Sequence, residues 1–489
     1  MATPIPKNRA AFTAQELQRA AGGAIVGRPV EGVVGVTTDS RAVVPGELFV
    51  ALSGDRFDAH EFLPTAWDAG AAAAVVAESA DIEVPADRWA LVVADPLLAL
   101  GAIARFHRLR WAASQKDPFV VAVTGSAGKT STKELAAGAL EHLTGPGALL
   151  KTAGNLNNRI GVPLTILGLD SSHRGALLEL GTSEKGEIAT LGAIARPTVA
   201  CVIMASAAHT EGIGDLAAVV HEKSSLFFAA PETTVGVCRR DQPALFQRAE
   251  QAQLERLLGF GVDPEADIRL VESTIHSDGK TQVRFQINGR EVAGALQMLG
   301  RGAGENAAAA IGIAMAVGVD PEVAIQKLEA VPPFAGRLAP RRLLSGGLLI
   351  DDSYNANPVS MALSLEVLRE LAGGRPTIAV LGDMLELGDE SADAHVEVGE
   401  QVVAARVDHF VACGPAMAEA AQRVRDKGGS VTEVADAGAA LLDARAHLGP
   451  NTVVLVKGSR SLGLEAVSQA LASENTAAEN TAPREGGAQ

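Results

Sequence analysis

The sequence predicts a three-domain α/β protein, and two observations lead to this fold class. Apolar, β-branched runs alternate with alanine-rich helical patterns, an order typical of mostly parallel sheets with helices on both faces. The 489 residues also exceed what one hydrophobic core supports. We expect a smaller α/β domain at residues 1–112, a central doubly wound domain at 113–337, a Rossmann-like domain at 338–472, and a disordered tail at 473–489, where the composition is polar and repetitive.

The composition favours a soluble cytoplasmic protein. A formal net charge of −16 argues against a nucleic-acid partner, because phosphate backbones require a basic face. Cys201, Cys238 and Cys413 lie in separate apolar runs without a C-x-x-C pair, so we expect buried, reduced thiols. The N-terminus has no apolar signal core, and no apolar run reaches the roughly 18 residues that a membrane span needs.

A phosphate-binding loop is expected at residues 120–134, where a strand pattern, a glycine-bearing turn and a helical pattern follow one another. Backbone N–H groups from Gly125 to Gly128 can point at an anion, Lys129 adds a charge for the β- and γ-phosphates, and Thr130 offers a hydroxyl to Mg²⁺. The full motif has glycine where this chain has Val123, so a glycine-rich turn with an incidental lysine is the alternative.

Three further side chains of the central domain are candidates. Glu179 ends a buried strand pattern, where a carboxylate is costly unless it is paired or binds a metal. His209 follows the next strand pattern, where a metal ligand and a hydrogen-bonded core imidazole are equally reasonable. Lys223 lies in a helical pattern, and on the residues alone it is a solvated helix lysine.

Other polar groups stand at the ends of strand patterns or at helix starts. Ser40 and Arg41 can hold a phosphate, or they can form a charged surface turn. Asn306 begins an alanine-rich helix, where it can pair with a base edge or cap the helix. Residues 268–292 read as a hairpin with Asn288-Gly289 at its turn. In the third domain the polar groups are the segments 351–358, 382–388 and 457–460.

Taken together, these motifs resemble those of the ATP-dependent Mur ligases. The matching segments are TGSAGKTS, TAGNLNNRIGVPLT at residues 152–165, ELG and AAHTEG around Glu179 and His209, DDSYNANPVSM, LGDMLELGDES, and VLVKGSRS. They occur in family order over nearly the whole chain except the tail. The N-terminal segment DSRAVVPGELFVALSGDRFDAHEF is similar to the family's uridine-nucleotide-binding segment.

The resemblance implies an ATP-dependent peptide ligase, most similar to the members that add a dipeptide. Such enzymes join D-alanyl-D-alanine to UDP-N-acetylmuramoyl-tripeptide through an acyl phosphate, in the last cytoplasmic step of peptidoglycan precursor synthesis. A ligase that adds the third peptide residue and an ATPase switch without ligase activity are the alternatives. The variant that adds a diamino acid has a D-N-P-R motif, whereas this chain has GDMLELG. We expect a monomer that uses ATP and Mg²⁺ at two sites.

The resemblance also implies roles for individual residues. Thr130 and Glu179 would hold one Mg²⁺, and His209 would hold the second beside a carbamylated Lys223. The implied catalytic residues are Lys129, Glu179, His209, Lys223 and Arg337. The implied nucleotide-binding residues are Thr124, Gly125, Ser126, Ala127, Gly128, Lys129, Thr130, Ser131, Asn306, Arg337, Asp352 and Asn355. The implied substrate-binding residues are Ser40, Arg41, Asn155, Asn157, Asn158, Thr182, Ser183, Asn357, Lys457, Ser459 and Arg460.

The chain departs from the family pattern at three elements, namely the segments 181–188, 203–204 and 300–306, and the last of these bears on adenine binding. The usual G-R-H-N-x-x-N appears here as the segment 300–306, so Gly302 and Ala303 stand where the family has histidine and asparagine. Only Asn306 remains of that polar set, which leaves the contacts to adenine open.

Overall fold

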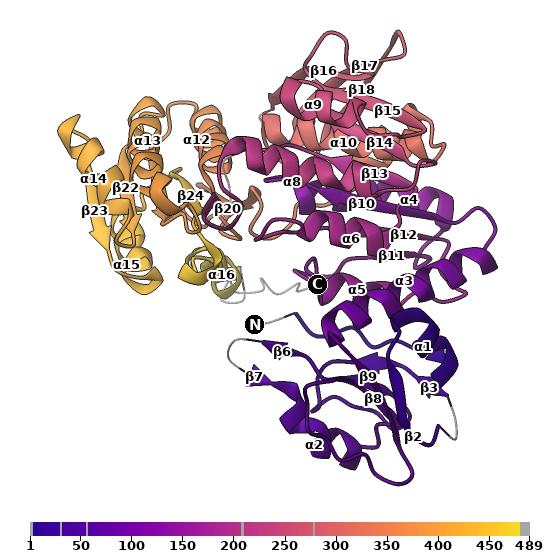
Figure 1. Cartoon of the computed structure of the whole chain (residues 1–489). Helices are drawn as coiled ribbons and strands as arrows, with labels where there is room; N and C mark the ends of the chain where they lie inside the picture. The colour runs from indigo at the N-terminus through magenta and orange to yellow at the C-terminus, as the bar shows by residue number, and fades with distance from the viewer. Residues whose placement is uncertain (1–2, 30–31, 55–56, 207–209, 277–278, 480–489) are drawn as a thin grey trace, which may run out of the picture.

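The computed structural model describes residues 3–29, 32–54, 57–206, 210–276 and 279–479. Within them, three large sheets follow one another along the chain, each with its own helices, and two two-stranded sheets, β1-β3 and β6-β7, accompany the first. The N-terminal unit lies below the central one in Figure 1, and the C-terminal unit lies to its left. The expected three-domain α/β fold with a mostly parallel central sheet is confirmed. None of the helices formed by the described residues is long and apolar enough to cross a membrane.

The N-terminal unit has a five-stranded sheet in the order β2-β9-β8-β5-β4, which is parallel except at β2. Its first helix begins at a capping box: the Thr13 side chain accepts from the Glu16 N–H, and the Glu16 carboxylate accepts from the Thr13 N–H. The elements are β1 Ala11–Phe12, α1 Ala14–Ala21, β2 Ala24–Gly27, β3 Val33–Val34, β4 Val36–Thr37, β5 Leu48–Val50, β6 Ser53–Gly54, β7 Phe57–Asp58, η1 Ala59–Phe62, α2 Leu63–Asp68, β8 Ala73–Ala77, β9 Trp89–Val93 and α3 Pro96–Ser114.

The central unit has a nine-stranded sheet in the order β11-β12-β10-β13-β14-β15-β16-β17-β18. It is parallel from β11 to β16, and β16, β17 and β18 pair antiparallel. The strands are β10 Phe119–Thr124, β11 Leu149–Lys151, β12 Gly175–Glu179, β13 Val199–Val202, β14 Val235–Arg239, β15 Arg256–Gly261, β16 Ile268–Ile275, β17 Thr281–Ile287 and β18 Arg290–Leu296. The helices are α4 Lys129–Thr144, α5 Gly161–Ile166, α6 Glu187–Ala195, α7 Thr210–Ile213, α8 Leu216–Ala229, α9 Pro243–Glu250, α10 Arg301–Ala316 and α11 Pro321–Glu329.

Strand β10 is apolar on both sides because helices cover both faces of this sheet. Val120 and Ala122 pack into one core with the N-terminal unit, whereas Val121 and Val123 pack into another with α4, α10 and α11. A strand that is buried on both faces reads as a continuous apolar run, as this one does in the sequence. The long helix α3 contacts α1, α5 and α6 and so joins the first two units.

The expected hairpin at residues 268–292 is present, as β17 and β18 joined by the predicted tight turn. Asn288 and Gly289 both have positive φ, at 50° and 77°, as a two-residue turn of this kind requires. Strand β16 pairs with β17 on its other side, so the segment forms a three-stranded extension of the central sheet.

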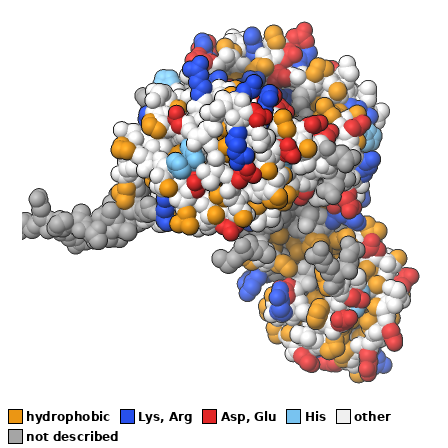
Figure 2. Space-filling model, turned by 90° about the vertical axis from the view of Figure 1, so that its left-hand side faces the viewer, with side chains coloured by type: hydrophobic (Ala, Val, Ile, Leu, Met, Phe, Trp, Pro, Cys, Tyr) orange, Lys and Arg blue, Asp and Glu red, His pale blue; other side chains and the backbone are white. Residues whose placement is uncertain are grey.

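The C-terminal unit has a six-stranded sheet in the order β19-β20-β24-β21-β22-β23, parallel except at β19. Figure 2 looks onto the side of the molecule on which this unit lies, and acidic and basic side chains are interspersed there. The strands are β19 Ala339–Arg342, β20 Leu348–Asp352, β21 Thr377–Gly382, β22 His409–Cys413, β23 Val431–Val434 and β24 Val453–Lys457. The helices are α12 Pro358–Ala372, η2 Gly388–Glu390, α13 Ser391–Ala404, α14 Met417–Asp426, α15 Ala437–His447, η3 Arg460–Leu462 and α16 Glu465–Glu479.

The chain end differs from the expected disordered tail at 473–489. Helix α16 continues through Ser473 to Glu479, and residues 480–489 lie outside the described part of the chain. Once a helix is nucleated, each further residue that is fixed adds one hydrogen bond without a new nucleation cost, and this stretch contains alanine and glutamate, which are good helix formers.

The capping box predicts a local stability change. Replacing Thr13 by Ala removes the hydroxyl that accepts from the Glu16 N–H, which costs about 1 kcal/mol of helix stability. Amide hydrogen exchange in α1 should then be about fivefold faster, while exchange in α4 stays unchanged. Thr13→Ser keeps the hydroxyl and should exchange like the wild type. Equal protection in the alanine and serine variants would show that the cap contributes nothing.

Candidate active site

The loop between β10 and α4 has the backbone conformation of a phosphate cradle. Gly128 precedes α4 with φ at 79°, and Gly125 has φ at 155°. A Cβ at position 128 would meet the Asn306 Oδ1 at 2.4 Å, so the loop excludes larger residues there. The Lys129 Nζ donates to the Gly125 carbonyl at 2.6 Å and thus folds back over the loop. This arrangement leaves a helix N-terminus and a lysine at the carboxyl end of β10.

Burial affects the protonation of Lys129. Desolvation lowers the pKa of its ammonium, the nearby Glu179 carboxylate opposes that shift, and the Arg337 guanidinium adds to it. An anion that brings negative charge to this loop would favour the charged ammonium.

The loop is fastened to the segment that follows β13. The Ser126 N–H donates to the Met204 carbonyl at 3.0 Å, and its hydroxyl donates to the Ser206 carbonyl at 3.1 Å. On the other side, the Thr124 hydroxyl donates to the Leu180 carbonyl at 2.8 Å. These bonds place the segment 203–206 beside the loop. His209, which sequence reasoning placed just beyond it, lies outside the described residues.

Glu179 ends β12 beside the loop, as predicted, and it is only 3% exposed. Its Oε2 accepts from the Thr130 hydroxyl at 2.9 Å, and its Oε1 accepts from the Asn157 side-chain amide at 3.0 Å. The two predicted Mg²⁺ ligands from different strand ends therefore meet in this structure. A carboxylate and a hydroxyl at hydrogen-bond distance are oxygen donors of the kind that Mg²⁺ prefers.

Lys133 is a buried cation that sequence reasoning missed. It is 1% exposed, its Nζ lies 3.7 Å from Glu179 Oε2, and it donates to the Thr152 carbonyl at 2.8 Å. The Thr152 hydroxyl in turn accepts from the Glu179 N–H at 2.9 Å. Because Lys133 follows Lys129 by one helical turn, the i, i+4 spacing could have placed it on the same face of α4.

Arg337 reaches the same site from the connection between the second and third domains. Its Nη2 donates to the Thr130 hydroxyl at 2.8 Å, and its guanidinium lies over the Tyr354 ring at 4.2 Å from the centroid. The guanidinium of Arg460 lies over the same ring at 4.8 Å. Two of the predicted arginines are thus held together by a tyrosine that sequence reasoning did not single out.

The predicted polar residues of the third domain bond to other groups of that domain, and Asp352, Lys457 and Ser459 among them are buried. Lys457 ion-pairs with Asp352 and also donates to the Asn355 carbonyl at 3.0 Å. The Ser459 hydroxyl accepts from the Leu385 N–H at 3.0 Å. Asn357 caps α12, since its side chain accepts from the Ser360 N–H. Asn355 is exposed and contributes its backbone carbonyl, and Arg460, which is also exposed, stacks on Tyr354 together with Arg337.

Lys223 is fully buried on α8, so the solvated-lysine interpretation made from the residues alone is wrong. Its Nζ is one of the buried side-chain atoms without a hydrogen-bond partner in the described structure. Desolvation and the charge of Lys129 lower the pKa of this amine well below its ordinary value, against the opposing charges of Glu222 and Glu187. The neighbouring Glu222 carboxylate accepts from the N–H groups of Gly186 and Ile188, so it is already engaged.

Of the remaining predicted side chains in the central domain, several stabilise local turns. The Asn158 side chain accepts from two N–H groups at the start of α5, and the Asn155 side chain accepts from the Thr3 hydroxyl at 2.7 Å. The Ser183 N–H donates to Glu187 at 2.7 Å, and the Thr182 hydroxyl donates to the Glu184 carbonyl at 2.6 Å. Ser131 follows Thr130 in the first turn of α4 and is half-buried.

Asn306 lies at the phosphate-binding loop, whereas Ser40 and Arg41 lie in the N-terminal domain. Asn306 on α10 accepts from the Thr132 hydroxyl at 3.2 Å and touches the loop at Gly128, so it lies at the phosphate site. In the N-terminal domain, Arg41 is exposed and pairs with Asp39 at 2.8 Å, and this hydrogen bond lowers the pKa of the aspartate. Ser40 beside it is buried.

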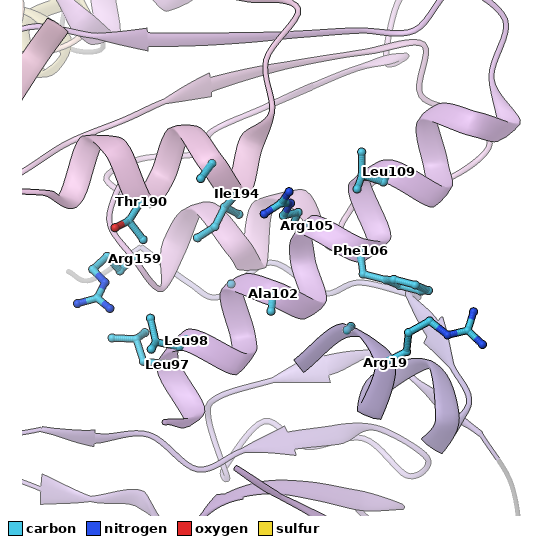
Figure 3. A pocket seen from close by; sticks show the side chains of 13 residues that line it. Arg19, Leu97, Leu98, Ala102, Arg105, Phe106, Leu109, Arg159, Thr190 and Ile194 are labelled. Atoms are coloured by element: carbon cyan, nitrogen blue, oxygen red, sulfur yellow. The ribbon is translucent and has the colours of Figure 1, made fainter. Parts of the chain in front are cut away.

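A cavity of about 500 Å³ lies elsewhere, between α1, α3 and α6. Figure 3 shows Arg159 and Arg19 toward opposite ends of it and Arg105 beside Ile194. The residues that line it include none from the loop at 124–130. The candidate active site is therefore defined by converging side chains at strand ends and not by this cavity.

Comparison with known proteins places these features in a family. Three family models match: the Mur ligase family catalytic domain at residues 32–108, the Mur ligase middle domain at 123–314, and the Mur ligase glutamate ligase domain at 336–460. The UDP-N-acetylmuramoyl-tripeptide–D-alanyl-D-alanine ligase of Escherichia coli K12 is 38% identical over 447 residues, 90% of this chain and 94% of that protein. The enzyme of that name from Bacillus subtilis 168 is 32% identical and covers 88% of this chain and 92% of its own length.

Solved structures give the same result. The structure of MurF from Acinetobacter baumannii superposes with a TM-score of 0.84 at 30% identity, over 96% of this chain and 99% of that one. MurF from Thermotoga maritima, solved in complex with ADP, superposes with a TM-score of 0.78 at 28% identity, over 91% of this chain and 98% of that one. The matched domains, the full-length relatives and the geometry around Glu179 agree, and the chain belongs to the Mur ligase family.

Proposed function

We propose that this protein is the ATP-dependent ligase that joins D-alanyl-D-alanine to UDP-N-acetylmuramoyl-tripeptide, forming the pentapeptide precursor of peptidoglycan in the cytoplasm. The relatives at 30% identity and above bear that enzyme's name and align over most of the chain. The observation that carries the proposal is the meeting of Thr130, Glu179 and Arg337 at the phosphate loop. The Arg337 guanidinium and two oxygen donors for Mg²⁺, the Thr130 hydroxyl and the Glu179 carboxylate, thus lie where a triphosphate would bind.

Ligation by this route needs two anions to meet. A carboxylate oxygen of the tripeptide attacks the γ-phosphorus of ATP, ADP leaves, and the amine of D-alanyl-D-alanine then displaces phosphate from the acyl phosphate. The Lys129 ammonium and the Arg337 guanidinium can offset charge on the transferring phosphoryl group. Desolvation around Lys129 strengthens such an interaction, because less water screens it.

Magnesium fits the residues present. The Thr130 hydroxyl and the Glu179 carboxylate offer oxygen donors 2.9 Å apart, and Asn157 orients the carboxylate from its other oxygen. When bound, the cation would neutralise phosphate oxygens. We assign a second Mg²⁺ to His209, which lies outside the described residues. Lys133, buried beside Glu179, keeps the carboxylate from being an isolated buried charge.

Lys223 suits a carbamate. Its amine is buried, unpartnered and shifted toward the neutral form, which is the form that attacks CO₂. In that step the nitrogen forms a bond to the CO₂ carbon and releases one proton, giving an anionic carbamate. The new carboxylate-like group would face the second metal and would relieve the unsatisfied Nζ.

The outer domains supply the substrates' binding surfaces in this proposal. Ser40 and Arg41 of the N-terminal domain, at 1–112, bind the uridine nucleotide, while Asn155, Asn157, Asn158, Thr182 and Ser183 line the path to Glu179. The nucleotide is bound by Asn306, Asp352 and Asn355. The peptide or the incoming dipeptide is bound by Asn357, Lys457, Ser459 and Arg460. Domain closure is expected to complete the site, since Arg337 and Arg460 stand on the connection and on the third domain. We expect a monomer.

The ligase that adds the third peptide residue is a less suitable assignment. A structure of the diaminopimelate-adding ligase superposes with a TM-score of only 0.57 at 18% identity, which is a likeness of fold. The comparison with MurF structures extends over the same length at higher identity.

The function is tested by phosphate release. With ATP and Mg²⁺, we expect release to depend on both UDP-muramoyl-tripeptide and D-alanyl-D-alanine. The acyl phosphate forms only on the peptide carboxylate, and its phosphate leaves when the amine of the dipeptide attacks. Assays with the tripeptide replaced by the dipeptide precursor plus a diamino acid serve as the control for the related ligase. Phosphate release that ignores every peptide substrate would identify an ATPase and overturn the ligase assignment.

Glu179→Gln should lower kcat by at least about 100-fold. The amide preserves the shape of the side chain but removes the charge that a Mg²⁺ ligand supplies. Raising the Mg²⁺ concentration should recover part of the lost rate. Glu134→Gln is the matched control, because Glu134 pairs with Lys151 and Lys133 without touching the Thr130 hydroxyl. Similar kinetics in the two variants would contradict the assignment of Glu179.

Lys223→Ala should lose most of the activity, and added formate or acetate should restore part of it. The small carboxylate would occupy the space of the lost carbamate group, whereas chloride at the same ionic strength would not. Lys223→Arg, which keeps a cation but cannot form the carbamate, should remain inactive without rescue. Full activity of the alanine variant, or equal rescue by chloride, would rule out the carbamate.

A further inference from the structure

Two histidines and an aspartate of the C-terminal domain converge at a place that the ligase reaction does not use. His409 is the first residue of β22, and Asp443 and His447 stand one turn apart on α15, which contacts β22. The His409 Nε2 lies 2.7 Å from Asp443 Oδ2, and the His447 Nδ1 lies 3.5 Å from the same oxygen. One ligand atom from each residue falls within 4.8 Å of the others.

The three side chains form a partly enclosed cluster. The side chain of His409 is 7% exposed, that of Asp443 is 16% exposed, and that of His447 is 42% exposed. The two imidazole rings stack with their centroids 3.5 Å apart. The cluster is therefore buried on the His409 side and open to solvent on the His447 side. An ion can enter from the open side, and a water molecule can bind it there.

His409 has a second partner that can fix its ring, whereas the His447 ring has to turn before it can bind an ion. The Nδ1 of His409 lies 2.9 Å from the Ser430 hydroxyl, which can either accept or donate a hydrogen bond. The ring can therefore carry its proton on Nδ1, which frees the Nε2 lone pair beside Asp443. The Nδ1 of His447 lies 3.0 Å from the Asp443 carbonyl, and rotation of this exposed ring can exchange that bond for a metal bond. Orientation of a histidine ligand by a second hydrogen bond is usual at metal centres.

We propose that His409, Asp443 and His447 bind one Zn²⁺-type transition-metal ion, with water as the fourth ligand. Two imidazole nitrogens and one carboxylate oxygen suit Zn²⁺, Co²⁺ or Ni²⁺, whereas Mg²⁺ and Ca²⁺ prefer sites made of oxygen atoms. The 3.5 Å between His447 Nδ1 and Asp443 Oδ2 is close to the roughly 3.3 Å that separates neighbouring ligand atoms of a tetrahedral ion with bonds of about 2.0 to 2.1 Å. The 2.7 Å between His409 Nε2 and the same oxygen is a hydrogen-bond distance, so these two atoms would move apart when an ion enters.

The position of the cluster assigns it a structural role. His409 stands at the amino end of β22, while the polar groups of the ligase site, such as Lys457 and Asp352, stand at the carboxyl ends of the neighbouring parallel strands. In Figure 1, β22 and α15 belong to the half of the domain that is farther from the central unit. A bound ion would join strand to helix and raise stability without entering the reaction.

The test compares metal binding by the wild type and His447→Gln. His447 is exposed, so this substitution removes a ligand without opening the core. The full-length protein is first stripped with a chelator and then titrated with Co²⁺ in excess Mg²⁺ without nucleotide, while visible absorption reports nitrogen ligation. His173→Gln is the matched control, because His173 makes a similar exposed pair with Asp170 but has no second imidazole in its pair.

We expect the wild type and His173→Gln to bind one Co²⁺ that Zn²⁺ displaces, and His447→Gln to bind it at least about tenfold more weakly. Saturating Zn²⁺ should raise the thermal midpoint of the wild type by about 5 °C and leave that of His447→Gln unchanged. Asp443→Asn should behave like His447→Gln. Equal stoichiometry and affinity in the wild type and His447→Gln, or an equal loss in His173→Gln, would overturn the proposal. Because no step measures ligation, these outcomes do not depend on the proposed function.

Discussion

The buried carboxylate of Glu179 is the constraint on which the rest of the site depends. A lone carboxylate would be expensive at 3% exposure, and here each oxygen has a donor while Lys133 approaches to 3.7 Å. The Thr130 hydroxyl that donates to it also accepts from Arg337, which belongs to the connection to the third domain. The Thr130 hydroxyl therefore connects the Glu179 carboxylate to Arg337, and through Arg337 to the position of the third domain.

The parallel central sheet explains why these residues meet. Parallel strands present their carboxyl ends at one edge, so β10 delivers the phosphate loop, β12 delivers Glu179, and β13 leads into the segment that holds Ser126. Helix α8, which contacts β13 and α6, holds Lys223 fully buried. The site is thus built from backbone connections at strand ends, while the large cavity between α1, α3 and α6 belongs to the junction of two domains.

Much of this could be predicted from local sequence, and the exceptions have physical reasons. The three large sheets, the capping box at Thr13 and the turn at Asn288 follow from patterns of neighbouring residues. The pairing of Thr130 with Glu179, 49 residues apart, was implied by the resemblance to the family. The burial of Lys223 could not be predicted, because it depends on what packs against α8. Lys133 and Tyr354 were missed since their roles arise from contacts between distant segments. Asn357, expected to bind substrate, caps a helix, a role that depends on where α12 begins.

Tyr354 has a consequence for how this molecule can be observed. The chain contains a single tyrosine and three tryptophans, and all three tryptophans stand in the first 112 residues. The phenol ring lies beneath the guanidinium groups of both Arg337 and Arg460, at the connection between the second and third domains. A fluorinated or isotopically labelled tyrosine would therefore give one resonance without site-directed labelling, and its chemical shift would report the arginine stacking at the hinge while indole fluorescence reports the opposite end of the protein.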